Sequence, residues 1–479
     1  MDEQRNSADR PVTPRRRKRT KAQIFKETYL PAIIAGCAVI LCMVFVITSL
    51  VRSAAEKKAQ EEAYNASVAA AQAQKEAWDK EALQLLEISQ QFADQYEYDK
   101  AITVIDTFTG DLADYPELLQ KRSDYVQTKS QLVLWDDPSK VVNLSFQILI
   151  ADPSRAYKNH AYGSSYNRNF VTIEEFSKIL EQLYANGYVL VNMDDVVKAE
   201  ENEDGQTVLS ANSLYLPAGK KPLILTQTQV NYYTYMTDSD GDKLPDGGGA
   251  GFASKLILDE NGKLINEMVD AAGNTVTGAY DLVPILDAFV EQHPDFSYRG
   301  AKAILAVTGY DGLFGYRTNA SAKKHFGEEA YNTAVGEVKK VIQALRDNGY
   351  QIACYTYENM AYGSISTGQI KSDMNAWAKE VLPILGEADI FVFAQNSDIA
   401  GADQAFSGDK FYTLKNLGFR YYLGFCNSNG TPWTYMEDGY FRMGRLMVSG
   451  SNMAYNSGWF TGIFEPASVL DPNRGTVPR

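Results

Sequence analysis

A run of 24 uncharged residues, Thr28 to Val51, is the feature that most limits how this 479-residue chain can fold. Its core reads IIAGCAVILCMVFVITSLV and is strongly apolar. At a helical rise of about 1.5 Å per residue, the run is long enough to cross a bilayer core of about 30 Å. We therefore expect a transmembrane helix at residues 28–51. A cleaved signal peptide is the alternative, although its apolar region usually has only about 7 to 15 residues.

The charges around this segment predict its orientation. Seven Lys and Arg lie in residues 11–30 and only three in residues 52–71, and cytoplasmic flanks carry the excess of positive charge. Residues 1–27 are therefore expected to be a basic cytoplasmic tail of a single-pass cell-membrane protein whose remainder is extracellular. The tail has nine Lys and Arg against four Asp and Glu, so the total charge of -14 leaves -14 - 5 = -19 for the rest. A body this acidic argues against nucleic-acid binding.

Residues 52–139 are expected to form a helical stalk. From Ala54 the sequence is rich in Ala, Gln, Glu and Lys, and it contains neither Gly nor Pro until Gly110, a composition that favours helix. Residues 85–108 and 115–132 are amphipathic and predict a helical hairpin that resembles one tetratricopeptide-type unit. One unit is not an array, so a spacer or dimerising stalk and a module for a protein partner both remain open.

Residues 140–479 alternate short apolar strands with amphipathic helices. Thr172 and Glu175 form a capping-box pattern before a helix, and the Asn-Gly pairs at 186–187 and 348–349 end helices that lead into β-rich runs. About seven such strands can be counted, among them NLSFQILI, PLILT, AKAILAVTG and DIFVFA. This alternation predicts an α/β fold, a (β/α) barrel.

The pattern is interrupted between Met236 and Tyr280, where turns such as Glu-Asn-Gly-Lys predict β-hairpins inserted on the loop face of the barrel. The insertion begins with TDSDGDKLPD, a loop in which alternating carboxylates could wrap a hard cation. It is not an EF-hand, because Lys243 replaces the glycine at the sixth position and Gly249 replaces the bidentate glutamate. Weak calcium binding and an acidic solvated loop both remain open. The four candidate ligands are Asp238, Asp240, Asp242 and Asp246.

Four stretches resemble a known family: VTIEEFSKILEQLYANGYVLVNMDD, KPLILTQTQVNYYTYM, HPDFSYRGAKAILAVTGYDGLFGYRT and LRDNGYQIACYTYENMAYG. In order and spacing they resemble the polysaccharide deacetylase family (carbohydrate esterase family 4, the NodB-like homology domain), in a membrane-anchored form of Gram-positive bacteria. The resemblance implies a distorted (β/α) barrel over residues 140–479. It also implies an activity, the metal-dependent removal of acetyl groups from cell-surface carbohydrate.

The residues that perform this chemistry in the family are replaced here. The family's T-F-D-D motif places a general base and a metal ligand at a strand end, where this chain has Thr228 and Gln229 after Thr226 and Gln227. Its H-x-x-x-H motif supplies two further ligands one helical turn apart, where this chain has Tyr355 and Asn359. Such side chains make neither a base near pH 7 nor a zinc site, so catalytic zinc is not expected.

The barrel mouth is nevertheless expected to be polar and aromatic, which suits sugar hydroxyl groups and sugar rings. Three interpretations remain open: a non-catalytic domain that binds cell-surface glycan, peptidoglycan or a partner protein, a collapsed cleft, and a working enzyme with an atypical site. None of the three histidines, His160, His293 and His325, falls at a motif position. The expected mouth residues are Gln227, Thr228, Gln229, Asn231, Tyr232, Tyr310, Tyr316, Arg317, Tyr355 and Asn359.

Overall fold

The computed structural model describes residues 20–158, 161–437 and 439–479. The chain divides into two compact units, Met1–Leu83 and Gln84–Arg479. His160 lies outside the described residues.

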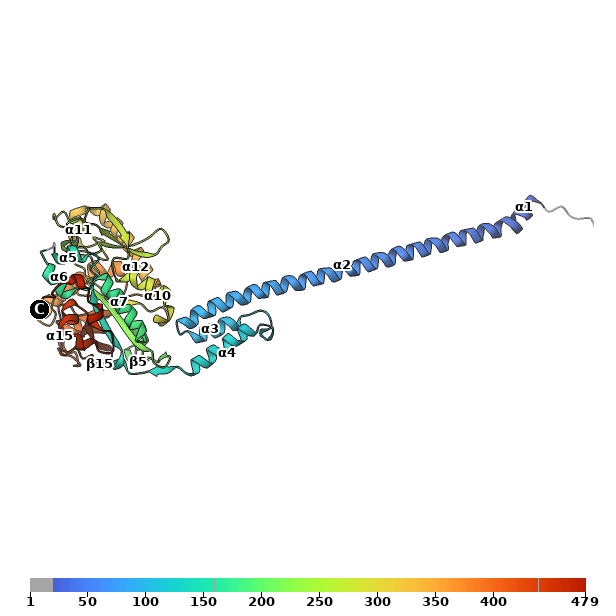
Figure 1. Cartoon of the computed structure of the whole chain (residues 1–479). Coiled ribbons are helices and arrows are strands. Elements are labelled where there is room, and N and C mark those ends of the chain that lie inside the picture. The colour runs from blue at the N-terminus through green and yellow to red at the C-terminus, as the bar shows by residue number, and fades with distance from the viewer. Residues whose placement is uncertain (1–19, 159–160, 438) are drawn as a thin grey trace, which may run out of the picture. The chain divides into compact units, whose positions relative to one another are not determined.

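The described part of the first unit is one continuous helix. It consists of α1 (Lys21–Ile24), a π-helical segment (Phe25–Tyr29) and α2 (Leu30–Asp94), which continues into the second unit (Figure 1). This helix is long and apolar enough to cross a membrane, and a signal sequence would meet the same criterion of length and composition. The domain boundaries expected at residues 51 and 139 stay predictions, since α2 runs unbroken through the first.

A helical hairpin opens the second unit. The end of α2 is followed by α3 (Tyr98–Asp106) and α4 (Pro116–Ser130), after a turn in which Tyr96 adopts a φ of 66°. Ala101 and Ile105 of α3 are buried, as is Tyr125 of α4, so the two amphipathic faces pack as the sequence predicts. The Tyr96 hydroxyl donates to the carbonyl oxygen of Asp295 at 2.5 Å and so attaches the hairpin to the barrel.

Seven parallel strands close into a barrel, as the alternation of strands and helices predicts. Their order around the barrel follows the sequence, and the ring closes because β16 pairs with β2 while β7 pairs with both β2 and β11. A further strand, β3 (Tyr188–Leu190), pairs with the first residues of β7 beside β11, which distorts the barrel. The barrel strands are β2 (Val142–Gln147), β7 (Lys221–Thr228), β11 (Ala303–Val307), β12 (Gln351–Cys354), β13 (Ile390–Val392), β14 (Tyr421–Phe425) and β16 (Tyr440–Met447).

Helices surround this barrel, and their ends match the sequence signals. The capping box of Thr172 and Glu175 starts α7, and Gly187 and Gly349 take φ values of 78° and 85° after α7 and α12. The longer helices between successive strands are α7 (Ile173–Ala185), α10 (Leu282–Gln292), α12 (Glu328–Asp347), α13 (Thr367–Ala376) and α15 (Gly408–Lys415). Shorter helices are α5 (Pro153–Lys158), α6 (Gly163–Asn169), α8 (Met193–Val196), α9 (Thr234–Thr237), α11 (Ala320–Phe326), α14 (Leu382–Leu385), α16 (Gly450–Tyr455) and α17 (Pro466–Val469).

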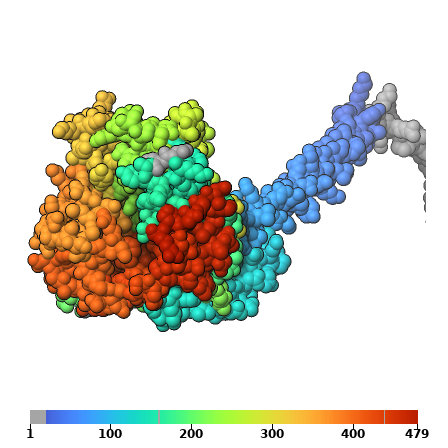
Figure 2. Space-filling model, turned by 60° about the vertical axis from the view of Figure 1, so that its left-hand side comes forward, coloured from blue at the N-terminus to red at the C-terminus, as the bar shows by residue number. Residues whose placement is uncertain are grey.

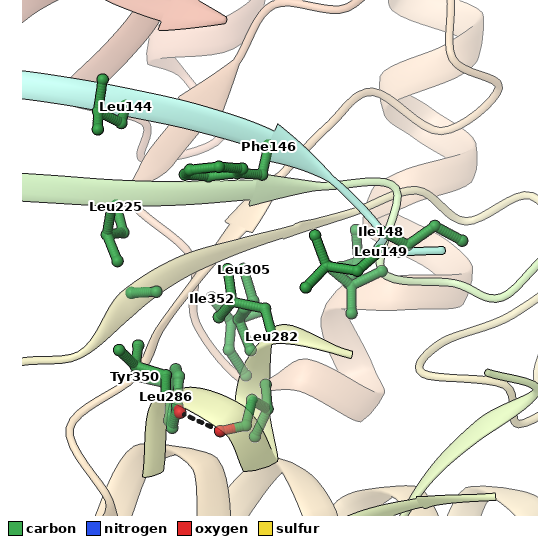
Figure 3. Close-up of a cluster of buried hydrophobic side chains, with 14 of the residues drawn as sticks. Leu144, Phe146, Ile148, Leu149, Leu225, Leu282, Leu286, Leu305, Tyr350 and Ile352 are labelled. Atoms are coloured by element: carbon green, nitrogen blue, oxygen red, sulfur yellow. Dashed lines mark hydrogen bonds between the residues drawn. The ribbon is translucent and has the colours of Figure 1, made fainter. Parts of the chain in front are cut away.

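Strand alternation divides the core into two parts. Outward-facing side chains such as Leu144 and Leu225 belong to the same cluster of buried residues as Leu282 and Leu286 of α10 (Figure 3). The inward-facing neighbour Ile224 belongs to a separate cluster that fills the barrel. Because successive side chains of a strand point to opposite faces, this alternation decides which residues at the strand ends reach the mouth.

The C-terminal segment, which follows β16, covers part of the outside of the barrel. It forms a continuous surface (red) beside residues of the β2 to α7 region (teal) in Figure 2. Arg474 forms a buried ion pair with Glu175 of α7, with Nη2 and Oε2 2.5 Å apart. The side chain of Asn167 in α6 donates to the carbonyl oxygen of Arg474 at 3.0 Å. These contacts fix the chain end against the first helices of the barrel.

The insertion forms the β-hairpins that its turns predict. Strands β8 (Lys255–Leu258), β9 (Leu264–Val269) and β10 (Thr275–Gly278) make a three-stranded antiparallel sheet. Three smaller pairings were not predicted: β1 (Val133–Trp135) with β6 (Leu214–Leu216), β4 (Val197–Glu201) with β5 (Thr207–Ala211), and β15 (Thr434–Glu437) with β16. Cys354 is buried and Cys426 is partly buried, and both are free thiols.

Candidate functional site

Four side chains from the barrel wall form a polar layer at the carboxyl ends of the strands, which we call the mouth layer: Ser145, Thr228, Tyr355 and Arg445. Ser145 and Thr228 belong to β2 and β7, Tyr355 follows β12, and Arg445 lies near the end of β16. All four are buried, with Tyr355 4% and Arg445 0% exposed. Below this layer the barrel interior is mostly apolar, with residues such as Ile304 and Leu423, and it contains a buried polar pair in which the Thr226 hydroxyl donates to Asn143 Oδ1 at 2.9 Å.

Tyr355 lies where the expected motif residues meet. Burial raises the pKa of its phenol, while the Arg445 cation and hydrogen bonds from the Gln395 backbone and the Gln229 and Thr228 side chains act in the opposite direction. Thr228 also donates from Oγ1 to the carbonyl oxygen of Phe146 at 3.2 Å. The structure therefore places Thr228, Gln229 and Tyr355 close together, and the Thr228 hydroxyl is bonded to the backbone.

Arg445 is the mouth-layer residue that sequence reasoning missed. Its guanidinium donates to Ser145 Oγ at 2.9 Å, to the carbonyl oxygen of Phe393 at 2.9 Å and to that of Gly424 at 3.1 Å. Within the described residues, no carboxylate forms an ion pair with it. Burial lowers its pKa to about 10, so the group stays protonated at neutral pH. The available signal was a pair of charged residues, Arg442 and Arg445, in a strand that is otherwise mostly apolar.

The second metal-ligand motif does not adopt the helical geometry that its spacing predicts. Tyr355 and Asn359 lie in an irregular loop after β12, and both Thr356 and Asn359 have positive φ, 60° and 56°. The Asn359 carbonyl oxygen accepts from Gln395 Nε2 at 2.5 Å, while its buried side-chain Oδ1 has no hydrogen-bond partner. The two residues are thus held by the backbone of a loop and not by one face of a helix.

Left-handed residues other than glycine are concentrated in the loops around the mouth. Gln229 follows β7, Thr356 and Asn359 follow β12, and Gln395 and Asn396 follow β13, all with φ between 52° and 63°. Each such residue costs on the order of 1 to 3 kcal/mol and persists only where the surroundings hold it. Non-glycine residues of this kind are frequent at functional sites, which makes the mouth the candidate site of the barrel.

Gln227 and Tyr232 do not line the mouth, contrary to expectation, because β7 directs Gln227 outward. Gln227 Nε2 donates to Asp281 Oδ1 at 2.6 Å and the Tyr232 hydroxyl donates to Asp281 Oδ2 at 2.7 Å. Asp281 precedes α10 and is fully buried, and burial raises its pKa to about 6. These residues form a polar cluster between the barrel wall and the helix layer.

Three further residues expected at the mouth have structural contacts elsewhere. Asn231 binds both backbone groups of Thr308, donating to its oxygen at 2.8 Å and accepting from its nitrogen at 2.9 Å. Arg317 donates to the backbone oxygens of Asp311 and Tyr232 at 3.0 and 2.9 Å. Tyr316 lines a separate groove beside the insertion. The sequence places these three residues near the strand ends, but it does not show whether their side chains point into the mouth.

Three exposed tyrosines lie in the segments that follow β2, β7 and β11, and we call them the tyrosine surface: Tyr162, Tyr235, which belongs to α9, and Tyr310. They are 54%, 46% and 51% exposed. The Tyr162 and Tyr235 rings are 6.1 Å apart, and buried Tyr233 links the group, 5.6 Å from Tyr235 and 5.9 Å from Tyr310. Only Tyr310 was predicted; an abundance of tyrosine in these segments was the signal for the others.

The acidic loop brings three of its four predicted ligands together. One carboxylate oxygen from each of Asp238, Asp240 and Asp246 lies within 4.8 Å of the others, and Asp242 is not in this group. The Asp238 carboxylate accepts a hydrogen bond from the backbone of Asp240 at 3.0 Å. Calcium binding here stays a prediction.

The two described histidines have ordinary surroundings. His293 packs against Tyr184 and Phe289, with ring centroids 4.4 and 4.7 Å apart, and His325 is exposed beside Phe326. Neither belongs to the mouth layer.

Comparisons with known proteins add little to this geometry. No family model matches the chain, and no curated protein matches it. A solved structure, the Streptococcus pyogenes deacetylase PplD in complex with acetate, is similar over 66% of this chain and 94% of that chain, with 10% sequence identity and a TM-score of 0.35. The assignment of an α/β barrel therefore rests on the strand order and pairing described above.

Proposed function

We propose that this protein is a membrane-anchored, extracellular, deacetylase-like barrel that has no catalytic activity and binds cell-surface glycan. One observation supports the absence of catalytic activity. At the strand ends where the resemblance places a base and metal ligands, this chain has Thr228, Gln229 and Tyr355, beside the buried cation of Arg445. Among the described residues, no Asp, Glu or His takes part in this layer.

The physical consequence is the loss of both parts of the chemistry. Hydrolysis of an acetamide by this family's route needs a metal ion that lowers the pKa of bound water and polarises the carbonyl group. It also needs a base to accept the proton, which contributes about 10²- to 10⁴-fold to the rate. The Thr228 hydroxyl is no base at neutral pH, and the positive charge of Arg445 in a low-dielectric interior repels a divalent cation.

The tyrosine surface supports the proposal that the barrel binds glycan. Aromatic ring faces bind the apolar faces of sugar rings, and phenol groups exchange hydrogen bonds with their hydroxyls. Tyr235 and Tyr310 are about half exposed while they rest on buried Tyr233. Little side-chain entropy is lost when a ligand binds to rings that neighbours already hold in place.

Affinity chromatography tests the binding. Full-length protein in a detergent without a sugar headgroup should be retained on immobilised peptidoglycan or chitooligosaccharide. Each of Tyr235→Ala and Tyr310→Ala should weaken binding about 2- to 10-fold, as expected from about 0.5 to 1.5 kcal/mol per aromatic contact. Tyr412→Ala is the matched control, because Tyr412 is 55% exposed on α15. Retention that all three variants leave unchanged would remove the tyrosine surface from the proposal.

A further inference from the structure

A groove of about 640 Å³ lies between the sheet of the insertion and helix α12, apart from the mouth layer. We call it the insertion groove. Its volume is in the range of sites that hold ligands of a few residues or rings. Its apolar lining comes from the acidic loop, β9, the end of α11 and the first half of α12: Leu244, Pro245, Val269, Phe326, Ala330 and Ala334.

The groove exists because the first half of α12 does not pack closely on the sheet. The buried residues of α12 all lie in its second half, from Val338 to Leu345. The first half presents Ala330 and Ala334 to the groove, and these short side chains leave the space that larger residues would fill. The opposite wall is one face of the sheet, on which Lys255 pairs with Glu267 and Thr275 with Val269.

Some of the described charged residues of the groove form ion pairs and others do not. Lys255 lies 3.5 Å from Glu267 and its ammonium group lies over the Tyr316 ring at 5.2 Å, so these two charges are paired. Glu329 and Glu337 also line the groove, and both are exposed. Within the described residues, neither forms an ion pair or a side-chain hydrogen bond. The α12 wall therefore carries two carboxylates without a cation.

The remaining lining cations do not compensate the α12 wall. Arg317 is directed to the backbone oxygens of Asp311 and Tyr232. Lys243 lies on the acidic loop, and within the described residues it forms no ion pair with Glu329 or Glu337. Charge complementarity therefore favours a ligand that carries its positive charge toward Glu329 and Glu337.

The aromatic residues of the groove are poorly placed for sugar. The ammonium groups of Lys255 and Lys323 each lie 5.2 Å from the ring centroid of Tyr316 and Tyr331, respectively. One face of each ring is thus occupied by a cation, whereas stacking on a sugar needs a free face. An apolar cavity beside unpaired carboxylates matches a hydrophobic side chain followed by a basic one.

We propose that the insertion groove binds a peptide segment of a partner protein, in which a hydrophobic side chain enters the cavity and an adjacent Lys or Arg pairs with Glu329 and Glu337. This site is distinct from the tyrosine surface and does not depend on glycan binding. Glycan and peptide could therefore be bound by the same molecule at the same time.

Fluorescence anisotropy tests the proposal with full-length protein in nanodiscs of zwitterionic lipid. The probes are four fluorescein-labelled hexapeptides that place Leu or Phe before two Lys or two Arg, and the same peptides with Glu in place of the basic residues. The basic probes should bind at least 10-fold more tightly than the acidic ones. Ala334→Trp should abolish binding by filling the cavity.

Charge-reversal variants separate specific pairing from general attraction. The double variant Glu329→Lys/Glu337→Lys should weaken the basic probes at least 10-fold, while Glu181→Lys, an exposed control on α7, should leave them unchanged. Thermal unfolding by circular dichroism confirms that each variant is folded. Equal binding of basic and acidic probes, no binding of either, or an equal effect of Glu181→Lys overturns the proposal. Competition by chitooligosaccharide that Ala334→Trp removes would also overturn it and make the groove a glycan site.

Discussion

Replacing Asp281 by Asn should change how the stability of the protein depends on pH. The Asp281 carboxylate is fully buried and accepts from the Leu149 backbone at 2.9 Å, from Gln227 at 2.6 Å and from Tyr232 at 2.7 Å. No cation among the described residues is paired with it. Burial is the largest cause that raises its pKa from 3.8 to about 6, and the hydrogen bonds only partly oppose it.

The sign of the effect follows from this raised pKa. The folded state binds the Asp281 proton more tightly than the unfolded state does, so the contribution of this group to stability is fully present below pH 3.8. It is lost as the pH rises through about 6. The difference of about two pH units between the folded and unfolded pKa values corresponds to about 3 kcal/mol.

Urea unfolding of full-length protein, followed by tryptophan fluorescence between pH 4 and pH 7, measures this difference. The free energy of unfolding of the natural protein should fall by about 2.4 kcal/mol relative to Asp281→Asn over that range, since part of the effect is already lost at pH 4. Asp204→Asn, on the exposed β4–β5 hairpin, controls for the loss of one carboxylate. Parallel pH profiles for the natural protein and Asp281→Asn, within about 0.5 kcal/mol, would refute the reasoning, since additivity errors have that size.

Three further predictions concern other parts of the chain. Arg445→Lys should lower the free energy of unfolding by about 2 to 4 kcal/mol, since one ammonium group cannot reach the three acceptors that the planar guanidinium binds; an unchanged urea midpoint would contradict this. Calorimetry should detect calcium binding at the acidic loop at about 10⁻⁴ to 10⁻³ M, and Asp240→Ala should abolish it; heat that survives the substitution would place the ion elsewhere. Protease added to intact cells should digest a C-terminal tag if the barrel is extracellular, whereas a protected tag would reverse the expected topology.

The fold was predictable because its signals are local and repeated. Thr172 caps a helix through Glu175, and the Asn-Gly ends at Gly187 and Gly349 each return the chain to a strand. These signals need no knowledge of distant residues. The β4–β5 hairpin escaped prediction because its strands are short and only partly buried, and three of the five residues of β4 are charged, so the apolar alternation that marks a strand is weak.

The position of a site residue along a strand was predictable, but the face of the strand to which its side chain points was not. Thr228 and Tyr355 meet as the motif spacing predicts, but Gln227 points to the opposite side of the same strand because alternation reverses the face at each residue. Arg445 was missed because its partners Ser145 and Phe393 are distant in sequence. Which tyrosines stay exposed is likewise decided by loop packing, which local sequence does not encode.

The most direct test of the central claim measures acetate release and metal content together. Full-length protein in a detergent without a sugar headgroup would be incubated with N-acetylated chitooligosaccharides and with peptidoglycan, and its zinc, cobalt and nickel would be measured by mass spectrometry. Because Thr228 cannot act as a base and Tyr355 and Arg445 occupy the mouth layer, we expect neither acetate above the blank nor a stoichiometric metal. Acetate release that a chelator abolishes would contradict the account and establish an active deacetylase with an atypical site.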